Sequence, residues 1–156
     1  MKGFLAGKFK LKDMGAVSMF VGLSITRDRQ KQEIYITHAH YDGEILDMYN
    51  LVSCNPTTVP MMPMSQLSKA TPDEELTPAI KRLYQAIVGS LRFLMNCTRP
   101  DLAFSVNKLA QFASSHTEAH LQVAKYVLRY VRGTVGSKMR IGPGRSTGLM
   151  GYFDSS

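Results

Sequence analysis

The stretch TEAHLQVAKYVLRYVRG, residues 117–133, carries the strongest fold information in the chain. Its apolar residues recur at helical spacing. The predicted buried face consists of Leu121, Ala124, Leu128 and Val131. Thr117 is placed to cap the helix and Gly133 to end it. Because only one face is apolar, this helix must pack against other elements. We therefore predict a long amphipathic helix inside a helical region.

The opposite face of this predicted helix is cationic. Gln122, Lys125, Arg129 and Arg132 follow one another at helical spacing, and such a row is able to track a phosphate backbone. An ordinary solvated surface is the alternative. The whole chain has a net charge of +7 and a pI of about 9.5. Because such a chain attracts polyanions, nucleic acid is the partner class that the charge favours.

Further helices are predicted upstream. Residues 38–50 form a short helix in this prediction, presenting Tyr41, Ile45, Leu46 and Tyr49. The segment 50–78 is rich in proline and is expected to be a linker. Thr77 and Pro78 then open a helix with an apolar stripe of Leu83, Ile87, Leu91 and Leu94. It breaks at Cys97–Pro100. Asp101 is placed in the first turn of the next helix, at the positive end of its dipole, and the predicted buried stripe there is Leu102, Val106, Leu109 and Ala113.

Strands are predicted near both ends of the chain. Apolar and polar residues alternate over Val17–Thr26, which indicates one strand, and the alternation resumes at Ile34–Thr37 after a charged loop, as in an antiparallel hairpin. Gly22 lies within the first strand, where glycine marks a bulge or the close approach of another backbone. A further short hairpin is expected from Ser137–Ile141. The prediction is an α+β fold in which a β-hairpin packs against three main helices, with a short incomplete hairpin at the C-terminus.

Bulk composition limits the classes of protein. With 156 residues, 44% of them apolar and 20% charged, the chain is expected to form one globular domain. No stretch approaches the roughly 20 apolar residues of a membrane span, and lysines occupy the positions where a signal peptide needs an apolar core. We therefore expect an intracellular chain, cytoplasmic or nuclear, without a membrane partner. Cys54 and Cys97 are expected to be free thiols.

Candidate catalytic and metal-binding groups are sparse. His116 and His120 have the spacing of a metal pair, as His38 and His40 do on a strand end, but no acid or cysteine completes a ligand set. Nucleotide-binding glycine loops and serine-nucleophile motifs are absent from the sequence. The acids of residues 73–75 precede a helix, where their charge suits the dipole. No metal site is predicted, and a small hydrolase has no motif in its favour.

Several motifs, taken together and in order, closely resemble the C-terminal part of copia-type reverse transcriptases over nearly the full length. The motifs are FKLKDMG at 9–15, FVGLSI at 20–25, IYIT at 34–37, Tyr84 with VGSL at 88–91, CTRPDLA at 97–103, and His120 with LRYVRGT at 128–134. In that family the hairpin corresponds to a primer grip, and the following helices to the thumb and connection. The resemblance divides the chain into a palm-edge segment at 1–37, a thumb- and connection-like region at 38–134, and the start of a ribonuclease H-like strand at 135–156.

The resemblance also implies a partner and a set of contact residues. It implies binding to a template-primer duplex or RNA/DNA hybrid, with the primer backbone close to Gly22 and phosphates at Lys125, Arg129 and Arg132. Arg99 is expected either to contact nucleic acid or to fix the turn between two helices. The remainder of the Pol polyprotein is a second implied partner.

Departures from the family pattern limit the expected chemistry. The family's Y-V-D-D carboxylates would lie upstream of Met1, and the chain has no Asp-Asp pair. Asp154 matches the first metal ligand of ribonuclease H, but the other carboxylates would lie downstream. We therefore expect no catalytic residues and no cofactor in this chain, although Mg²⁺ is implied for the parent enzyme. The expected activity is sequence-independent nucleic-acid binding. The alternative is an inert or protein-binding remnant of a transposon reading frame.

Overall fold

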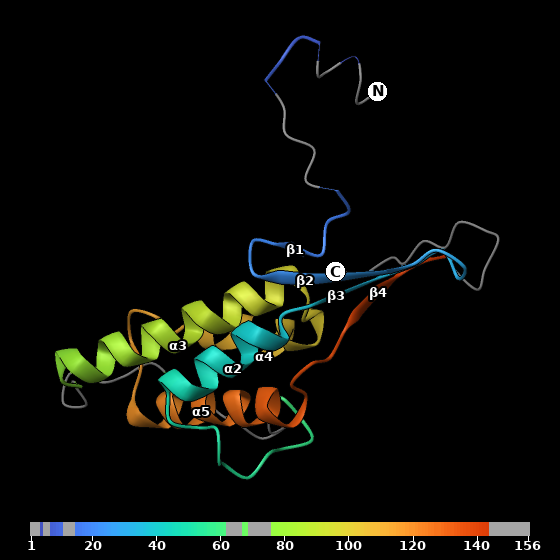
Figure 1. Cartoon of the computed structure of the whole chain (residues 1–156). Helices are drawn as coiled ribbons and strands as arrows, with labels where there is room; N and C mark the ends of the chain where they lie inside the picture. The colour runs from blue at the N-terminus through green and yellow to red at the C-terminus, as the bar shows by residue number, and fades with distance from the viewer. Residues whose placement is uncertain (1–3, 5–6, 11–14, 62–66, 69–75, 144–156) are drawn as a thin grey trace, which may run out of the picture.

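The helical region predicted from apolar periodicity is present in the computed structural model, which describes residues 4, 7–10, 15–61, 67–68 and 76–143 (Figure 1). Helix α3 (Pro78–Cys97) begins as expected, because the Thr77 hydroxyl accepts a hydrogen bond from the backbone N–H of Ile80. Helix α5 (Glu118–Gly133) also has its predicted bounds. Between them lie the 3-10 turn η2 (Pro100–Leu102) and helix α4 (Ala103–Ala110), and α2 (Ala39–Met48) precedes the linker.

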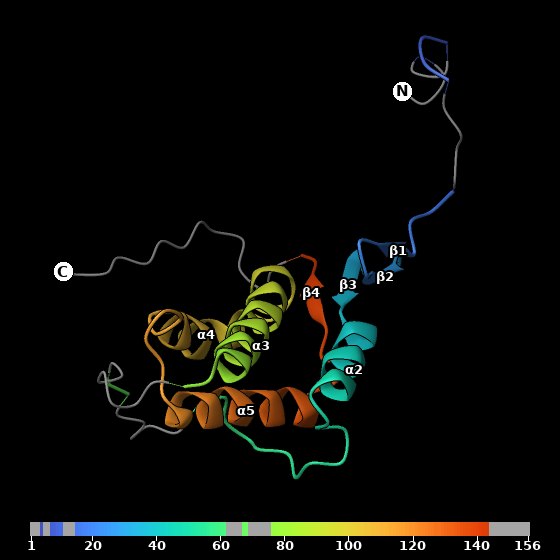
Figure 2. The same cartoon turned by 90° about the vertical axis from the view of Figure 1, so that its left-hand side faces the viewer.

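The apolar core lies among these helices. Figures 1 and 2 show α3 lying across α5, with α4 beside α3. All four residues of the predicted α5 face are buried, as are Leu102, Val106 and Leu109. The prediction for Leu83 was wrong, because its side chain is 36% exposed and Tyr84 is fully buried instead. Tyr84 shares one helical face with Ile87 and Leu91, and Leu83 is turned away from that face.

One four-stranded antiparallel sheet, in the order β1-β2-β3-β4, extends from the helices (Figure 1). Its strands are β1 (Met19–Phe20), β2 (Leu23–Asp28), β3 (Glu33–Thr37) and β4 (Met139–Ile141). The single strand predicted over residues 17–26 was wrong. Val21 and Gly22 have φ angles of 49° and 77°, and the chain reverses there, so that Phe20 pairs with Leu23. Positive φ at both central residues is the geometry of a tight hairpin turn.

Strand β4 pairs with β3, which lies far from it in the sequence. Ile36 pairs with Met139 and Ile34 with Ile141. The hairpin expected from residues 137–141 is therefore a single strand there, Met139–Ile141, and its partner is β3. At the helical end of the sheet, the Thr37 hydroxyl donates to the Ser137 carbonyl over 3.0 Å. The α+β class is therefore confirmed, with the hairpin enlarged to a sheet of four strands.

Candidate nucleic-acid interface

The cationic face of α5 is present, and part of the linker lies along it. The Arg129 Nε–H donates to the Asn55 carbonyl and the Arg132 Nε–H to the Val52 carbonyl, each over 2.7 Å. Lys125 is partly exposed on the same face. These bonds hold the two arginines in fixed positions, because a guanidinium that donates through Nε keeps its planar fork oriented.

The linker backbone also contacts α5 directly. The Thr57 N–H donates to the Arg129 carbonyl over 3.3 Å. A Cβ on Gly133 would lie 3.0 Å from the Pro56 Cβ and 3.1 Å from the Thr57 carbonyl oxygen. Gly133 therefore allows the linker to approach the last turn of the helix, a role that its predicted function as a helix stop did not include.

Gly22 lies in the exposed turn between β1 and β2. A Cβ built on it would meet nothing within 4 Å, so the positive φ requires glycine there and the surrounding space does not. The neighbouring side chains of Met19, Phe20 and Val21 are between 62% and 68% exposed. The expected close approach of a primer backbone to Gly22 stays a prediction, and the glycine is accessible for it.

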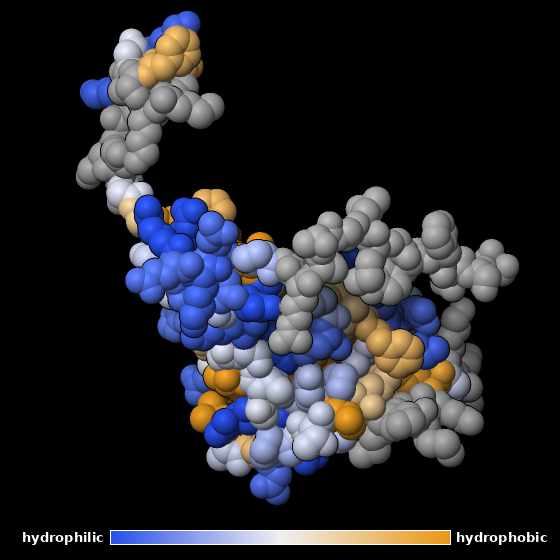
Figure 3. Space-filling view, turned by 90° about the vertical axis from the view of Figure 1, so that its right-hand side faces the viewer, coloured by the Kyte–Doolittle hydropathy of each residue, from blue (hydrophilic) through white to orange (hydrophobic). Residues whose placement is uncertain are grey.

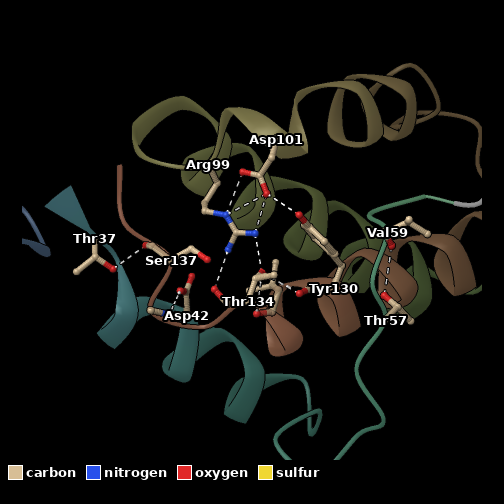
Figure 4. Close-up of polar contacts among 11 residues, drawn as sticks. Thr37, Asp42, Thr57, Val59, Arg99, Asp101, Tyr130, Thr134 and Ser137 are labelled. Carbon is tan, nitrogen blue, oxygen red and sulfur yellow. Dashed lines mark hydrogen bonds and ion pairs between the residues drawn. The ribbon is translucent and has the colours of Figure 1, made fainter. Parts of the chain in front are cut away.

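Arg99 is buried, 3% exposed, at the start of the turn between α3 and α4. Its Nε–H and Nη2–H groups donate to the Asp101 carboxylate, the latter over 2.8 Å, and Nη2 also donates to the Thr134 hydroxyl over 2.7 Å. The Tyr130 hydroxyl donates to the same carboxylate over 3.0 Å. Figure 4 shows Arg99 between the turn and the C-terminal end of α5. Of the two expected roles, these contacts give Arg99 the structural one, and its contact with nucleic acid stays a prediction.

The charges around Arg99 shift the pKa values of its neighbours. Burial alone would raise the pKa of Asp101, but the hydrogen bonds and positive charge of Arg99 outweigh burial and lower it. Asp101 thus has a specific partner in addition to the helix dipole that we expected. Asp42, 1% exposed, accepts only a long bond of 3.4 Å from the Gly136 N–H within the described residues, and burial raises its pKa.

The histidines considered as metal ligands have other partners. The His38 Nδ1 lies 2.8 Å from the Thr98 hydroxyl, and the His116 ring stacks on Tyr84 with centroids 4.2 Å apart. The Thr117 N–H donates to the His120 Nδ1 over 3.0 Å. Within the described residues no group of three or more His, Cys, Asp or Glu side chains is placed to hold a metal ion. The expected absence of a metal site stays a prediction, since Asp154 and the acids of residues 73–75 lie outside the described residues.

Two buried groups were missed by sequence reasoning about the site. The Tyr84 hydroxyl donates to the Leu109 carbonyl over 2.7 Å, and burial raises the pKa of Tyr84 to about 12. Asp42 carries no sequence signal, because a lone acid on a short helix normally faces solvent.

Cys54 and Cys97 are free, as expected. In the described part of the chain no helix is long and apolar enough to cross a membrane.

Comparison with known proteins places the chain beside transposon polyproteins. It is 33% identical over 99% of its length to the retrovirus-related Pol polyprotein from transposon TNT 1-94 of Nicotiana tabacum, and 33% identical over 97% to that from transposon RE1 of Arabidopsis thaliana. It covers 12% and 10% of those proteins. An uncharacterized mitochondrial protein of Arabidopsis thaliana is 28% identical over 97% of the chain and 60% of its own length.

No family model and no solved structure matches the chain. The polyprotein relatives nevertheless align with nearly all of it, at identities of 30–33% for the three from tobacco and Arabidopsis thaliana. A match of this extent includes the sheet and the helices together. The chain therefore belongs to the copia-type retrotransposon Pol polyproteins, and corresponds to one segment of them.

Proposed function

We propose that this chain binds the sugar–phosphate backbone of a nucleic-acid duplex without reading its sequence. The observation that supports this function is the outward face of α5, where Lys125, Arg129 and Arg132 form a row. Two of these cations are held in place by the linker carbonyls. No hydrogen bond engages the terminal Nη groups of Arg129 and Arg132 within the described residues, and these groups are the donors that match phosphate oxygens in pairs.

A contact of this kind depends on charge more than on base identity. Phosphate contacts release counterions, so the affinity falls steeply as salt rises, with a slope of about −0.9 per phosphate for a duplex. Three cations on one helix face imply a slope of roughly −3 from this surface. We propose no catalytic step for the chain, because its sequence lacks the Asp-Asp pair of the family's polymerase site.

The test is a titration of the purified chain against a fluorescent 20-base-pair RNA/DNA hybrid at two salt concentrations. We expect micromolar or tighter binding at low salt that weakens as salt rises. A variant with Lys125→Gln, Arg129→Gln and Arg132→Gln should bind at least 10-fold more weakly, with a smaller salt dependence. No binding by the wild-type chain at low salt would refute the function.

A control variant separates charge from the structural bonds of the arginines. Arg129→Lys with Arg132→Lys retains both positive charges but removes the Nε–H donors to Asn55 and Val52. This variant should keep its affinity within about threefold while losing some stability. Loss of binding in the lysine variant equal to that in the glutamine variant would show that the linker arrangement, and not the charge, is what matters.

Protein binding is the second candidate, and the exposed apolar end of the β1–β2 hairpin favours it. Met19, Phe20 and Val21 expose most of their surface at the edge of the sheet, and unpaired edge strands pair readily with other chains. If this candidate is correct, Phe20→Ser will weaken association with the adjoining Pol segment supplied as a separate chain. Binding of the Phe20→Ser variant to the RNA/DNA hybrid should be unchanged.

A further inference from the structure

The far end of the sheet contains an open groove that the α5 surface does not include. Its volume is about 490 Å³. The lining residues come from β2, the β2–β3 loop, β3 and the end of β4: Arg27, Arg29, Gln32, Ile34, Ile141 and Gly142. Figure 3 views the molecule from the side toward which the β2–β3 hairpin projects, and a contiguous hydrophilic surface lies there.

The pairing of the strands gives this groove an apolar floor beside a cation. Arg27 pairs with Ile34, and Ile34 with Ile141, so the three side chains lie in one row on the same face of the sheet. Ile141 is 50% exposed. A Cβ on Gly142 would lie only 2.8 Å from the Glu33 Cγ, so glycine lets the chain after β4 pass close to Glu33.

The acids near the groove are already engaged. Asp28 accepts from the backbone N–H groups of Gln30 and Lys31, each over 3.0 Å, and lies 3.8 Å from the Lys31 ammonium. Glu33 accepts from Arg140 over 2.6 Å and from the Tyr35 hydroxyl. Arg27 and Arg29 therefore line the groove without an ion pair among the described residues. Their positive charge is available to an anion.

We propose that this groove binds a phosphodiester group of the same polynucleotide that the α5 surface binds, a proposal that rests on the proposed function. The guanidinium groups of Arg27 and Arg29 donate to the phosphate oxygens, since their forked geometry matches such an anion. The Ile34–Ile141 floor lies against the apolar side of the sugar. The Gln32 amide, beside the arginines, supplies a further neutral donor and acceptor.

The groove is a contact separate from α5. The Thr37–Ser137 hydrogen bond marks the helical end of the sheet, and Ile34 lies three residues further along β3, a distance of about 10 Å. The groove is thus set off by this length of β3 from the helical end of the sheet, and sites that are more than about 7 to 10 Å apart and share no partner contribute nearly independently. Changes in the groove and on α5 should therefore have additive effects on the logarithm of the affinity.

The test measures binding of the full chain to the fluorescent hybrid by anisotropy at two salt concentrations. Arg27→Gln with Arg29→Gln should weaken binding about 10-fold and reduce the salt slope by about 1 to 2. Ile141→Glu, which leaves both arginines in place and puts a negative charge on the floor, should weaken it by at least as much. Circular dichroism checks that each variant is folded.

A charge-matched control keeps the result specific. Lys31→Gln with Lys108→Gln also removes two positive charges, one of them beside the groove but not in its lining, and should change the affinity less than threefold. The groove proposal would be overturned if the control variant lost as much affinity as the groove variants, or if the groove variants lost none. In either case, binding by the wild-type chain would still support the proposed function. No binding by the wild-type chain would overturn both. If the groove variants lost affinity and the α5 glutamine variant did not, the groove would stay assigned as a binding site. The α5 surface would then no longer be part of the proposed contact.

A free nucleotide carries the same phosphate chemistry, so a second titration uses ATP. We expect no saturable binding of ATP at concentrations up to 1 mM, roughly the range of a weak single-site contact. Tight binding of ATP that the Arg27→Gln, Arg29→Gln variant abolishes would assign the groove to a free nucleotide and overturn its assignment to a polynucleotide.

Discussion

Arg99 joins the turn between α3 and α4 to the end of α5, because its guanidinium contacts both Asp101 and Thr134. Arg99→Met keeps the length of the buried stem but removes these hydrogen bonds. We expect the free energy of unfolding to fall by about 2 kcal/mol, measured by urea denaturation with circular dichroism. Lys138→Met, at an exposed neighbouring position, should change it by less than about 0.5 kcal/mol. Equal stability of the two variants would contradict the role of Arg99.

The same contact predicts a pH dependence. Arg99 holds the pKa of Asp101 below its ordinary value of 3.8 in the folded chain, despite the opposing effect of burial. A lowered folded-state pKa gives stability that is complete above the unfolded-state value and disappears as pH falls through the folded-state value. The wild-type chain should therefore lose stability below about pH 4, as followed by thermal unfolding.

Asp42 acts in the opposite direction, since its pKa is raised, so the comparison must isolate Asp101. Asp101→Asn cannot ionise. Its melting temperature should be lower than that of the wild type at pH 7, and the difference should shrink between pH 4 and pH 2. A difference that stays constant with pH would show that the Asp101 charge contributes nothing to the fold.

The β1–β2 turn is an element whose sequence does not suit its geometry. Val21 has a φ of 49°, a conformation that costs a β-branched residue about 1 to 3 kcal/mol. Asn-Gly is the preferred pair for such a turn. Val21→Asn should therefore raise the melting temperature by several degrees, by roughly 1 kcal/mol of stability, as measured by calorimetry.

Gly22→Ala tests the same turn from the other side. Its φ of 77° disfavours any side chain, although nothing lies within 4 Å of the added Cβ. Gly22→Ala should therefore lower the melting temperature through backbone conformation alone. If Val21→Asn lowered the melting temperature and Gly22→Ala raised it, the turn would have a different backbone conformation.

At the scale of the whole molecule, the Arg140–Glu33 ion pair, whose atoms are 2.6 Å apart, links the edge strand β4 to β3. Arg140→Glu places two acids together, which should cost up to about 1 kcal/mol. Hydrogen exchange of the β3 amides should then be faster, while exchange in α3 and α5 is unchanged. The charge-swapped pair, Glu33→Lys with Arg140→Glu, should restore slow exchange, and a failure to do so would mean that the pair does not hold β4.

The helices were predictable because their signals are local. The spacing of Leu121, Ala124 and Leu128, and the Thr77-Pro78 start of α3, each specify structure within a few turns. The sheet was less predictable, because the pairing of Ile34 with Ile141 depends on chain folding between distant positions. A positive φ at Val21 has no signal in a residue type that avoids it.

The candidate site was predictable as a set of charges but not as a set of contacts. Periodicity placed Lys125, Arg129 and Arg132 on one face of α5. It had no means of revealing that the linker carbonyls meet two of them, because a linker without periodicity carries no signal of where it lies. The groove between Arg27, Ile34 and Ile141 depends on β4, so the sequence alone could not predict it without the register of the sheet.

The pairing of β4 with β3 affects how the chain folds during its own synthesis. Glu33 and Arg140 are 107 positions apart, so at ordinary rates of translation the ribosome adds the second strand about 5 to 20 s after the first. Throughout that interval one edge of β3 lacks its final neighbour, while the intervening helices are able to form from local contacts. An open edge is a site for mispairing, so this part of the nascent chain is most prone to aggregation before β4 emerges from the ribosome.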